Sequence, residues 1–195
     1  MSNLYTPKFL ISKENRLTLK NQKAFLIWFT GLSGSGKTSL ASSVEQYLFN
    51  KNHHTYILDG DNIRKGLNKD LGFSNIDRNE NIRRVSEVCT LFLDAGLITL
   101  ASFITPFETD RQILRNQFKD SYVEVYLRTP YAVCAKRDSK GIYSKVQGGS
   151  IKNFTGKDSK YEKPENPNII IDTSNEEICV STKKIIDYLE QNKYI

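Results

Sequence analysis

The chain has 195 residues, of which 38% are hydrophobic and 26% charged, a size and composition typical of one globular domain. No apolar run approaches the roughly 20 residues of a membrane-spanning helix, and the polar N-terminus lacks the apolar core of a secretory signal, so we expect a cytoplasmic protein without a membrane partner. The net charge of +6 is compatible with binding to nucleic acid or to small polyanions. The basic residues are dispersed and no nucleic-acid-binding module is present. We therefore expect small anionic substrates and no nucleic-acid partner.

In chain order, residues 1–22 are predicted to form an N-terminal extension with a short helix around 12–19, and residues 23–195 a single domain. The domain begins with the continuous apolar run 25–29, which is typical of a buried parallel strand. Similar runs predict four more strands, at 55–58, 97–104, 122–127 and 168–171.

Apolar residues at helical spacing predict amphipathic helices between these strands. The positions that define the first two helices are Leu40, Val44, Leu48, Ile82, Val85, Cys89 and Phe92. Gly96 is expected to end the second of them, Pro130 to occupy the first position of a later helix, and Ser174 with Glu177 to form a capping box that begins the last. Alternating strands and helices predict an α/β fold, a five-stranded parallel sheet with helices on both faces.

Between residues 138 and 167 the periodicity fails, and glycines, prolines and lysines accumulate. Irregular segments of this length are usually either functional lids or disordered. We interpret this stretch as a lid.

A glycine-rich loop between the first strand and the first amphipathic helix matches the phosphate-binding pattern G-x-x-x-x-G-K-[ST]. Its residues are Gly31, Leu32, Ser33, Gly34, Ser35, Gly36, Lys37 and Thr38. Glycines allow successive backbone N–H groups to turn inward, and the helix N-terminus adds partial positive charge. We predict that the loop binds the phosphates of ATP, that Lys37 reaches the β- and γ-phosphates, and that Thr38 is a ligand of Mg²⁺.

Two carboxylates, Asp59 and Asp61, follow the second predicted strand. Ligands of parallel sheets bind beyond the carboxyl ends of the strands, and phosphoryl transfer to a hydroxyl needs a carboxylate that orients the acceptor and helps to hold the metal. We assign that role to Asp61 and a supporting role to Asp59. The alternative is a polar turn that only closes the strand.

Further polar and aromatic residues fall where an acceptor would bind. Arg78, Asn81 and Arg84 share one helix face, where arginine suits anionic oxygens; the alternative is a solvated basic face. Ile104 and Thr105 end the third predicted strand at the same sheet edge. In the predicted lid, a lysine for anionic groups precedes an aromatic residue that could stack on a base: Lys152 and Phe154.

Together these segments resemble the adenylylsulfate (APS) kinases of sulfate assimilation. The resemblance covers residues 11–173 and rests on the segments W-F-T-G-L-S-G-S-G-K, D-G-D-N-I-R, D-R-N-E-N-I-R-R, F-I-T-P and I-K-N-F-T-G. It implies a P-loop kinase fold that transfers the γ-phosphate of ATP to the 3′-hydroxyl of APS. The products would be ADP and 3′-phosphoadenylyl sulfate (PAPS).

The resemblance also implies roles for individual residues. Asp61 would sit near the 3′-hydroxyl, and Arg137 would lie beside the adenine of ATP. Residues expected to bind APS are Asp61, Arg64, Phe73, Arg78, Asn81, Ile104, Thr105, Lys152 and Phe154. Phe73 and Phe154 would sandwich its adenine, and the arginines and Asn81 would contact its phosphosulfate. The family also suggests a homodimer and ATP sulfurylase as a possible functional partner.

One departure from the family concerns Thr105. The family usually has a serine at this position, and in some members that serine is described as a phosphorylated intermediate. The extra methyl restricts the rotamers of the side chain, so we expect direct in-line transfer. Two alternatives remain: another small-molecule P-loop kinase, such as a nucleoside monophosphate or sugar kinase, and a nucleotide-binding regulatory protein that has lost catalysis.

Overall fold

The computed structural model describes residues 5, 7–138, 140–150 and 154–195. Its strands are β1 (Leu26–Thr30), β2 (Thr55–Asp59), β3 (Ile98–Ser102), β4 (Tyr122–Leu127) and β5 (Ile169–Ile171). They form one sheet in the order β2-β3-β1-β4-β5, and every neighbouring pair is parallel. The five predicted strands are therefore confirmed, with bounds that differ by at most two residues.

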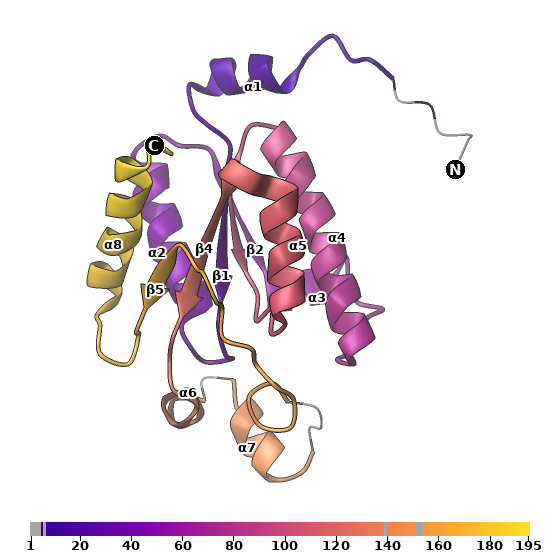
Figure 1. The fold of residues 1–195 in the computed structure, drawn as a ribbon, viewed down its shortest axis with the longest axis vertical. Coiled ribbons are helices and arrows are strands. Elements are labelled where there is room, and N and C mark those ends of the chain that lie inside the picture. Colours follow the sequence, from indigo (N-terminus) through magenta and orange to yellow (C-terminus); the bar gives the residue numbers. More distant parts are fainter. Residues whose placement is uncertain (1–4, 6, 139, 151–153) are drawn as a thin grey trace.

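Helices cover both faces of this sheet (Figure 1). They are α1 (Lys13–Lys20), α2 (Lys37–Asn50), α3 (Gly60–Lys65), α4 (Asn75–Asp94), α5 (Glu108–Phe118), α6 (Tyr131–Arg137), α7 (Ile142–Gln147) and α8 (Ile178–Gln191), with a short 3-10 turn η1 (Lys119–Ser121). Helices α2 and α8 lie on one face, and α4 and α5 lie on the other. The arrangement confirms the predicted α/β fold.

The central strand β1 shows why its apolar run is continuous. Ile27 and Phe29 pack into the core under α2 and α8, whereas Leu26 and Trp28 point into the core under α4 and α5. All four side chains are completely buried. A parallel strand with both faces covered cannot alternate apolar and polar residues, because neither face meets water.

Three helices were not predicted, namely α3, α5 and α7. Helix α5 buries Asp110 and Arg111 together with Leu114 and Phe118, so two charged residues interrupt the apolar stripe that a sequence pattern requires. Helix α7 falls inside the predicted lid and is only six residues long.

Some predicted helix boundaries are wrong in detail. Helix α8 begins after Glu177, which makes no side-chain capping bond, and the hydroxyl of Ser174 instead donates to Asp172. The predicted capping box at this helix is therefore absent. Pro130 lies one residue before the first turn of α6 rather than within it. In contrast, the short helix of the N-terminal extension is present and begins at a capping box on Ser12.

Candidate active site

The glycine-rich loop joins β1 to α2 at the carboxyl edge of the sheet. Gly34 has φ +74°, and a Cβ there would lie 3.0 Å from the carbonyl oxygen of Cys134, so only glycine allows this close approach. Gly36 precedes α2 and supplies no side-chain cap. The first N–H groups of α2 therefore have no capping side chain and can bind an anion.

Lys37 is held inside this loop. Its Nζ donates to the carbonyl oxygens of Gly31 at 2.9 Å and Leu32 at 2.8 Å, and the residue is only 9% exposed. Burial lowers the pKa of Lys37 to about 8. The ammonium group is thus charged near neutral pH, and it is positioned by neutral carbonyls that leave its charge uncancelled.

The hydroxyl of Thr38 meets a carboxylate from the end of β2. Thr38 Oγ1 donates to Asp59 Oδ2 at 2.8 Å, and Ser102 Oγ from the end of β3 lies 3.4 Å away. Hydroxyl and carboxylate oxygens are the ligands that Mg²⁺ prefers, and it usually keeps water and substrate phosphates as its remaining ligands. These residues therefore fit a magnesium ion. The described residues contain no cluster of three or more His, Cys, Asp or Glu side chains that could hold a metal ion.

Asp61 lies in the first turn of α3 and contacts a different partner. Its carboxylate forms an ion pair with Lys140 of the lid, while its backbone N–H donates to Asp59 Oδ1 at 3.0 Å. Helix α3 also carries Arg64, three residues further on. One short helix thus carries both the predicted acceptor carboxylate and the predicted APS-binding arginine.

Two arginines and an aromatic ring form the predicted acceptor side. The Arg64 guanidinium lies 4.5 Å from the centre of the Phe73 ring and donates to the carbonyl oxygen of Gly72 at 2.8 Å. Arg78 Nε donates to the carbonyl oxygen of Phe73 at 2.9 Å. Burial, together with the nearby charge of Arg64, lowers the pKa of Arg78. Because the positive charges of the two guanidinium groups repel each other, an anion bound beside them is favoured.

The three residues predicted to share one face of α4 have different environments. Asn81 is buried, and its side-chain oxygen accepts a hydrogen bond from Asn68 Nδ2 at 3.0 Å. Arg84 instead pairs with Asp70 and Glu80, each at 2.8 Å. The structure therefore separates a buried pair, Arg78 and Asn81, from an arginine whose charge is already matched.

Thr105 is buried and conformationally unusual. It is 1% exposed, its Oγ1 accepts a hydrogen bond from Trp28 Nε1 at 2.9 Å, and its φ is +43°. A β-branched residue in the left-handed region is an outlier that its surroundings must hold in place. Its neighbour Ile104 accepts a hydrogen bond on its carbonyl oxygen from Thr30 Oγ1 at 2.7 Å.

The two aromatic residues expected to sandwich adenine have different environments. Phe73 is 63% exposed, whereas Phe154 is 8% exposed and packs edge-on against Tyr143 at 4.9 Å. The adjacent Thr155 hydroxyl accepts a hydrogen bond from Arg78, so the lid touches the acceptor side. Lys152 falls outside the described residues, and its role stays a prediction.

Arg137 lies beside the phosphate loop, where its Nη1 is 3.5 Å from the carbonyl oxygen of Gly34. Its Nη1 donates to Thr173 Oγ1 at 3.0 Å, and its Nη2 donates to the Thr173 carbonyl oxygen at 2.5 Å. The Thr173 hydroxyl in turn donates to the carbonyl oxygen of Ser35 at 2.8 Å. Sequence reasoning missed Thr173, although its place just after β5 at the ligand edge of the sheet could have indicated it.

The lid is joined to the phosphate loop by contacts that the sequence did not reveal. Tyr143 OH donates to the carbonyl oxygen of Ser33 at 2.7 Å. Leu32 packs against the small buried cluster of Cys134, Tyr143, Val146 and Phe154. A Cβ at Gly156 would come within 2.9 Å of Leu32 Cδ2. These contacts show the lid seated on the loop.

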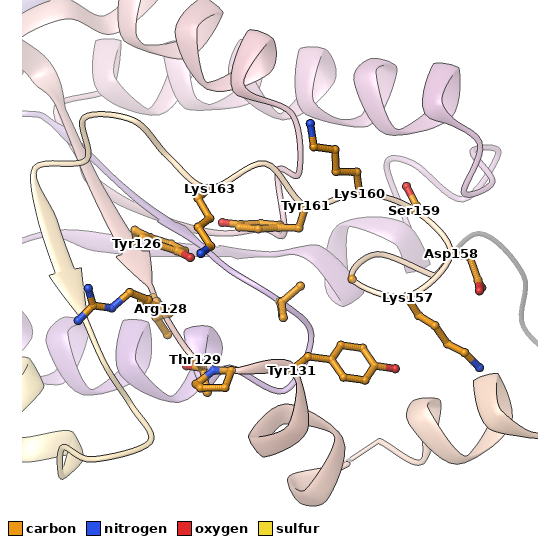
Figure 2. Close-up of a pocket in the computed structure, with 14 residues that line it drawn as sticks. Tyr126, Arg128, Thr129, Tyr131, Lys157, Asp158, Ser159, Lys160, Tyr161 and Lys163 are labelled. Atoms are coloured by element: carbon orange, nitrogen blue, oxygen red, sulfur yellow. The ribbon is translucent and has the colours of Figure 1, made fainter.

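A cavity of about 670 Å³ opens between the lid and the end of β4 (Figure 2). Its walls include Tyr126, Tyr131 and Tyr161 with several basic residues. Leu32 is the one lining residue that belongs to the predicted nucleotide-binding set. The cavity therefore lies beside the candidate active site and does not define it.

The parallel sheet, the loop held between β1 and α2, and the carboxylates at the end of β2 define a P-loop kinase. The family model described as Adenylylsulphate kinase matches residues 23–172. The chain belongs to this family, whose members transfer the γ-phosphate of ATP to the 3′-hydroxyl of APS and so produce PAPS for sulfate assimilation.

Individual relatives agree with this assignment. An adenylyl-sulfate kinase of Clostridium acetobutylicum is 52% identical over 196 aligned positions, which cover 100% of this chain and 97% of that protein. The Mycobacterium tuberculosis APS kinase CysC in complex with AMPPNP and APS has a TM-score of 0.83 and 44% identity, covering 87% and 99% of the two chains. A hexameric APS kinase from Thiobacillus denitrificans has a TM-score of 0.69 and 26% identity, covering 90% of this chain and 30% of that one.

Proposed function

We propose that this chain phosphorylates APS at two adjoining half-sites, with ATP on the phosphate loop and APS on the arginines. The observation that carries this assignment is the placement of Asp61 and Arg64 on the single short helix α3. Asp61 stands two residues from the carboxylate that contacts Thr38, and Arg64 lies against the exposed Phe73 ring. The acceptor hydroxyl would bind between these two environments, beside Asp61.

The donor half binds ATP. The backbone of residues 31–38 would hold the phosphates, and Lys37 would exchange its carbonyl partners for phosphate oxygens. Arg137, fixed by Thr173 beside the loop, would lie next to the adenine. These roles follow from a loop whose donors are positioned but lack an anionic partner.

The metal would lie between the loop and the end of β2. Thr38 and Asp61 are the residues predicted to hold it, and the contact between Thr38 and Asp59 supports Asp59 as an additional carboxylate on this side. When bound, Mg²⁺ supplies positive charge that stabilises the phosphate oxygens during transfer. Asp61 would orient the 3′-hydroxyl, whose oxygen attacks the γ-phosphorus as the bond to ADP breaks.

The acceptor half binds APS. Arg64, Arg78 and Asn81 would contact the phosphosulfate, because arginine forms paired bonds with planar or tetrahedral anions. Phe73 and Phe154 would stack on the adenine, with Ile104, Thr105 and Lys152 completing the site. Since Tyr143 packs on Phe154 and Lys140 pairs with Asp61, we expect the lid to rearrange when APS enters.

Transfer would be direct, without a phosphorylated Thr105. The Thr105 hydroxyl oxygen is buried and already accepts a bond from the Trp28 indole, so it presents no exposed nucleophile to ATP. Direct in-line transfer needs only the aligned acceptor and its electrostatic support.

The remaining assignments are broader. The described residues include no helix that is long and apolar enough to cross a membrane. We propose a homodimer in the cytoplasm, with ATP sulfurylase as the functional partner that supplies APS.

The assay that tests this function measures ADP formation by the purified chain with ATP, Mg²⁺ and different acceptors. ADP should form when APS is added, and Lys37→Ala should abolish turnover while circular dichroism shows an intact fold. Turnover of AMP or a sugar in place of APS would overturn the acceptor assignment.

A matched pair of arginine variants tests the acceptor half. Arg64→Gln removes a guanidinium from the proposed phosphosulfate site and should raise KM for APS by about 10-fold to 100-fold, the usual effect of a charged hydrogen bond. Arg83→Gln changes an exposed arginine that pairs with Glu80 on α4 and should leave KM unchanged. Equal effects of the two variants would contradict the proposed site.

A further inference from the structure

The end of the lid is hydrogen-bonded to the loop that follows β3. We define the acceptor loop as residues 104–106 and the lid anchor as Tyr161 and Glu162. The backbone N–H of Glu162 donates to the carbonyl oxygen of Pro106 at 2.8 Å, and Glu162 Oε2 accepts a hydrogen bond from the backbone N–H of Glu108 at 2.8 Å. Segments more than 50 residues apart in the chain therefore meet at this point.

Arg111 bridges the acceptor loop and the lid anchor with one guanidinium group. Its Nη1 donates to the carbonyl oxygen of Thr105 at 2.6 Å, and its Nη2 donates to that of Glu162 at 2.7 Å. The side chain is completely buried. Because the guanidinium is planar and rigid, it fixes the two carbonyls relative to each other.

The charge of Arg111 is matched, so its position is stable. Glu108 Oε2 lies 2.5 Å from its Nη2, and the fully buried Glu124 lies 3.6 Å from its Nε. Glu124 is also bound by Arg115 at 2.7 Å. Two of the Arg111 nitrogens nevertheless also donate hydrogen bonds to backbone carbonyl oxygens. An ion pair that only stabilised the fold would not require these additional bonds.

Tyr161 makes a second connection between the same segments. Its hydroxyl lies 2.9 Å from Thr30 Oγ1, and the single proton of Thr30 is donated to the carbonyl oxygen of Ile104 at 2.7 Å. The Tyr161 hydroxyl must therefore donate to Thr30. Its ring lies 5.8 Å from the Arg111 guanidinium and stacks on Tyr126 at 6.1 Å, as Figure 2 shows for the two tyrosines.

We propose that Arg111 and Tyr161 are positioning residues that couple the seating of the lid to the shape of the acceptor loop. Neither belongs to the residues proposed to contact substrate. Arg111 holds the carbonyl of Thr105 directly, and Tyr161 holds that of Ile104 through the Thr30 hydroxyl. The left-handed conformation of Thr105, at φ +43°, persists because its surroundings hold it. Loosening the anchor lets this loop relax and weakens APS binding, while the ATP half of the site stays intact. The inference rests on the proposed contact of residues 104 and 105 with APS.

The test uses Tyr161→Phe, which removes one hydroxyl and keeps the ring. KM for APS should rise about threefold to tenfold, as expected for one net hydrogen bond, and KM for ATP should stay within about twofold. Tyr126→Phe is the matched control, since the Tyr126 hydroxyl belongs to none of these bonds. Arg111→Lys keeps the buried charge but loses the rigid fork, and its effect on KM for APS should be larger.

A second measurement needs no acceptor. Amide hydrogen exchange at residues 104 and 105 of the ligand-free protein should quicken in Tyr161→Phe and remain unchanged in Tyr126→Phe. Unchanged exchange in Tyr161→Phe, or an equal rise of KM for both substrates, would overturn the coupling. Failure of the unaltered chain to use APS would overturn the proposed function instead, and the exchange experiment would still decide whether the anchor holds the loop.

Discussion

Single residues of the site are held mainly by backbone carbonyls. Lys37 donates to Gly31 and Leu32, and Arg64 donates to Leu71 and Gly72. A neutral carbonyl fixes the position of a cation and leaves most of its field available. Cations held in this way are suited to bind phosphate or sulfate, whereas Arg84, already paired with two carboxylates, is not.

The lowered pKa of Lys37 predicts how ATP affinity depends on pH. Burial brings the pKa of the free protein to about 8, and bound phosphate raises it again because it stabilises the charged form. Below pH 8 the group is already protonated. Above that value ATP must bind together with a proton, and its affinity should fall by up to about tenfold per pH unit.

Calorimetry in two buffers of different ionisation enthalpy measures this proton uptake, which should be close to zero at about pH 7 and approach one at about pH 9. Lys37→Arg stays charged throughout this range and should show no uptake. Proton uptake that persists in Lys37→Arg would assign the effect to another group.

Thr105→Ala tests direct transfer. The variant leaves the buried Trp28 N–H without its acceptor, which costs about 1–3 kcal/mol of stability, and it removes a β-branched side chain from a strained position. Most of kcat should remain. Trp28→Phe breaks the same bond but keeps the hydroxyl, so similar effects would indicate a structural role. Near-total loss of kcat in Thr105→Ala alone, with labelled phosphate on the unaltered protein, would establish a phosphorylated intermediate.

At the scale of elements, the lid is the part that sequence patterns described least. Helix α7 contributes Tyr143 and Val146 to a small cluster with Cys134 and Phe154. Only two apolar side chains of this helix are buried, too few to produce a helical period. The lid acquires its structure by packing on the phosphate loop and α6, which no local pattern encodes.

Two glycines of the lid provide a matched test of this packing. Gly156 and Gly149 both have positive φ, +94° and +74°, but a Cβ at Gly156 lies between Leu32 Cδ2 at 2.9 Å and the Tyr131 ring at 3.3 Å, whereas at Gly149 nothing lies within 4 Å. Both alanine variants should therefore incur backbone strain of about 1 kcal/mol. Only Gly156→Ala should lift the lid from the loop, speed its proteolysis and raise KM for ATP. Equal proteolysis of the two variants would argue against this docking.

Over the whole molecule, the predicted parts are those with a local signature. The continuous apolar run of β1 and the glycine spacing of the loop each express a local requirement, and both are confirmed in position. Helix α5 was missed because its buried Asp110 and Arg111 resemble surface residues in a sequence. Besides Glu108 on the same helix, Arg111 has partners on distant segments, the carbonyl oxygen of Glu162 and the carboxylate of Glu124 on β4, so its burial could not be predicted.

The N-terminal segment carries exposed apolar side chains. Phe9, Leu10 and Ile11 are consecutive and exposed by 78%, 99% and 58%, and contiguous exposed apolar side chains commonly mark an interface. We expect a second copy of the chain to cover them. Light scattering should give twice the mass of one chain, and Leu10→Ser should shift it towards the monomer. Phe49→Ser, at an exposed apolar residue on α2, should leave the dimer intact; a hexamer would contradict the prediction.

The sequence by itself determined the alternation of strands and helices, the phosphate loop and the placement of the carboxylates at the ligand edge of the sheet. These features depend on residue periodicity and backbone freedom, which are local properties. Only the tertiary structure decided which partners these residues have: Thr38 with Asp59, Asp61 with Lys140, and Thr105 with Trp28. Such pairings depend on where the crossovers place distant segments, and that placement is fixed by packing of the whole domain.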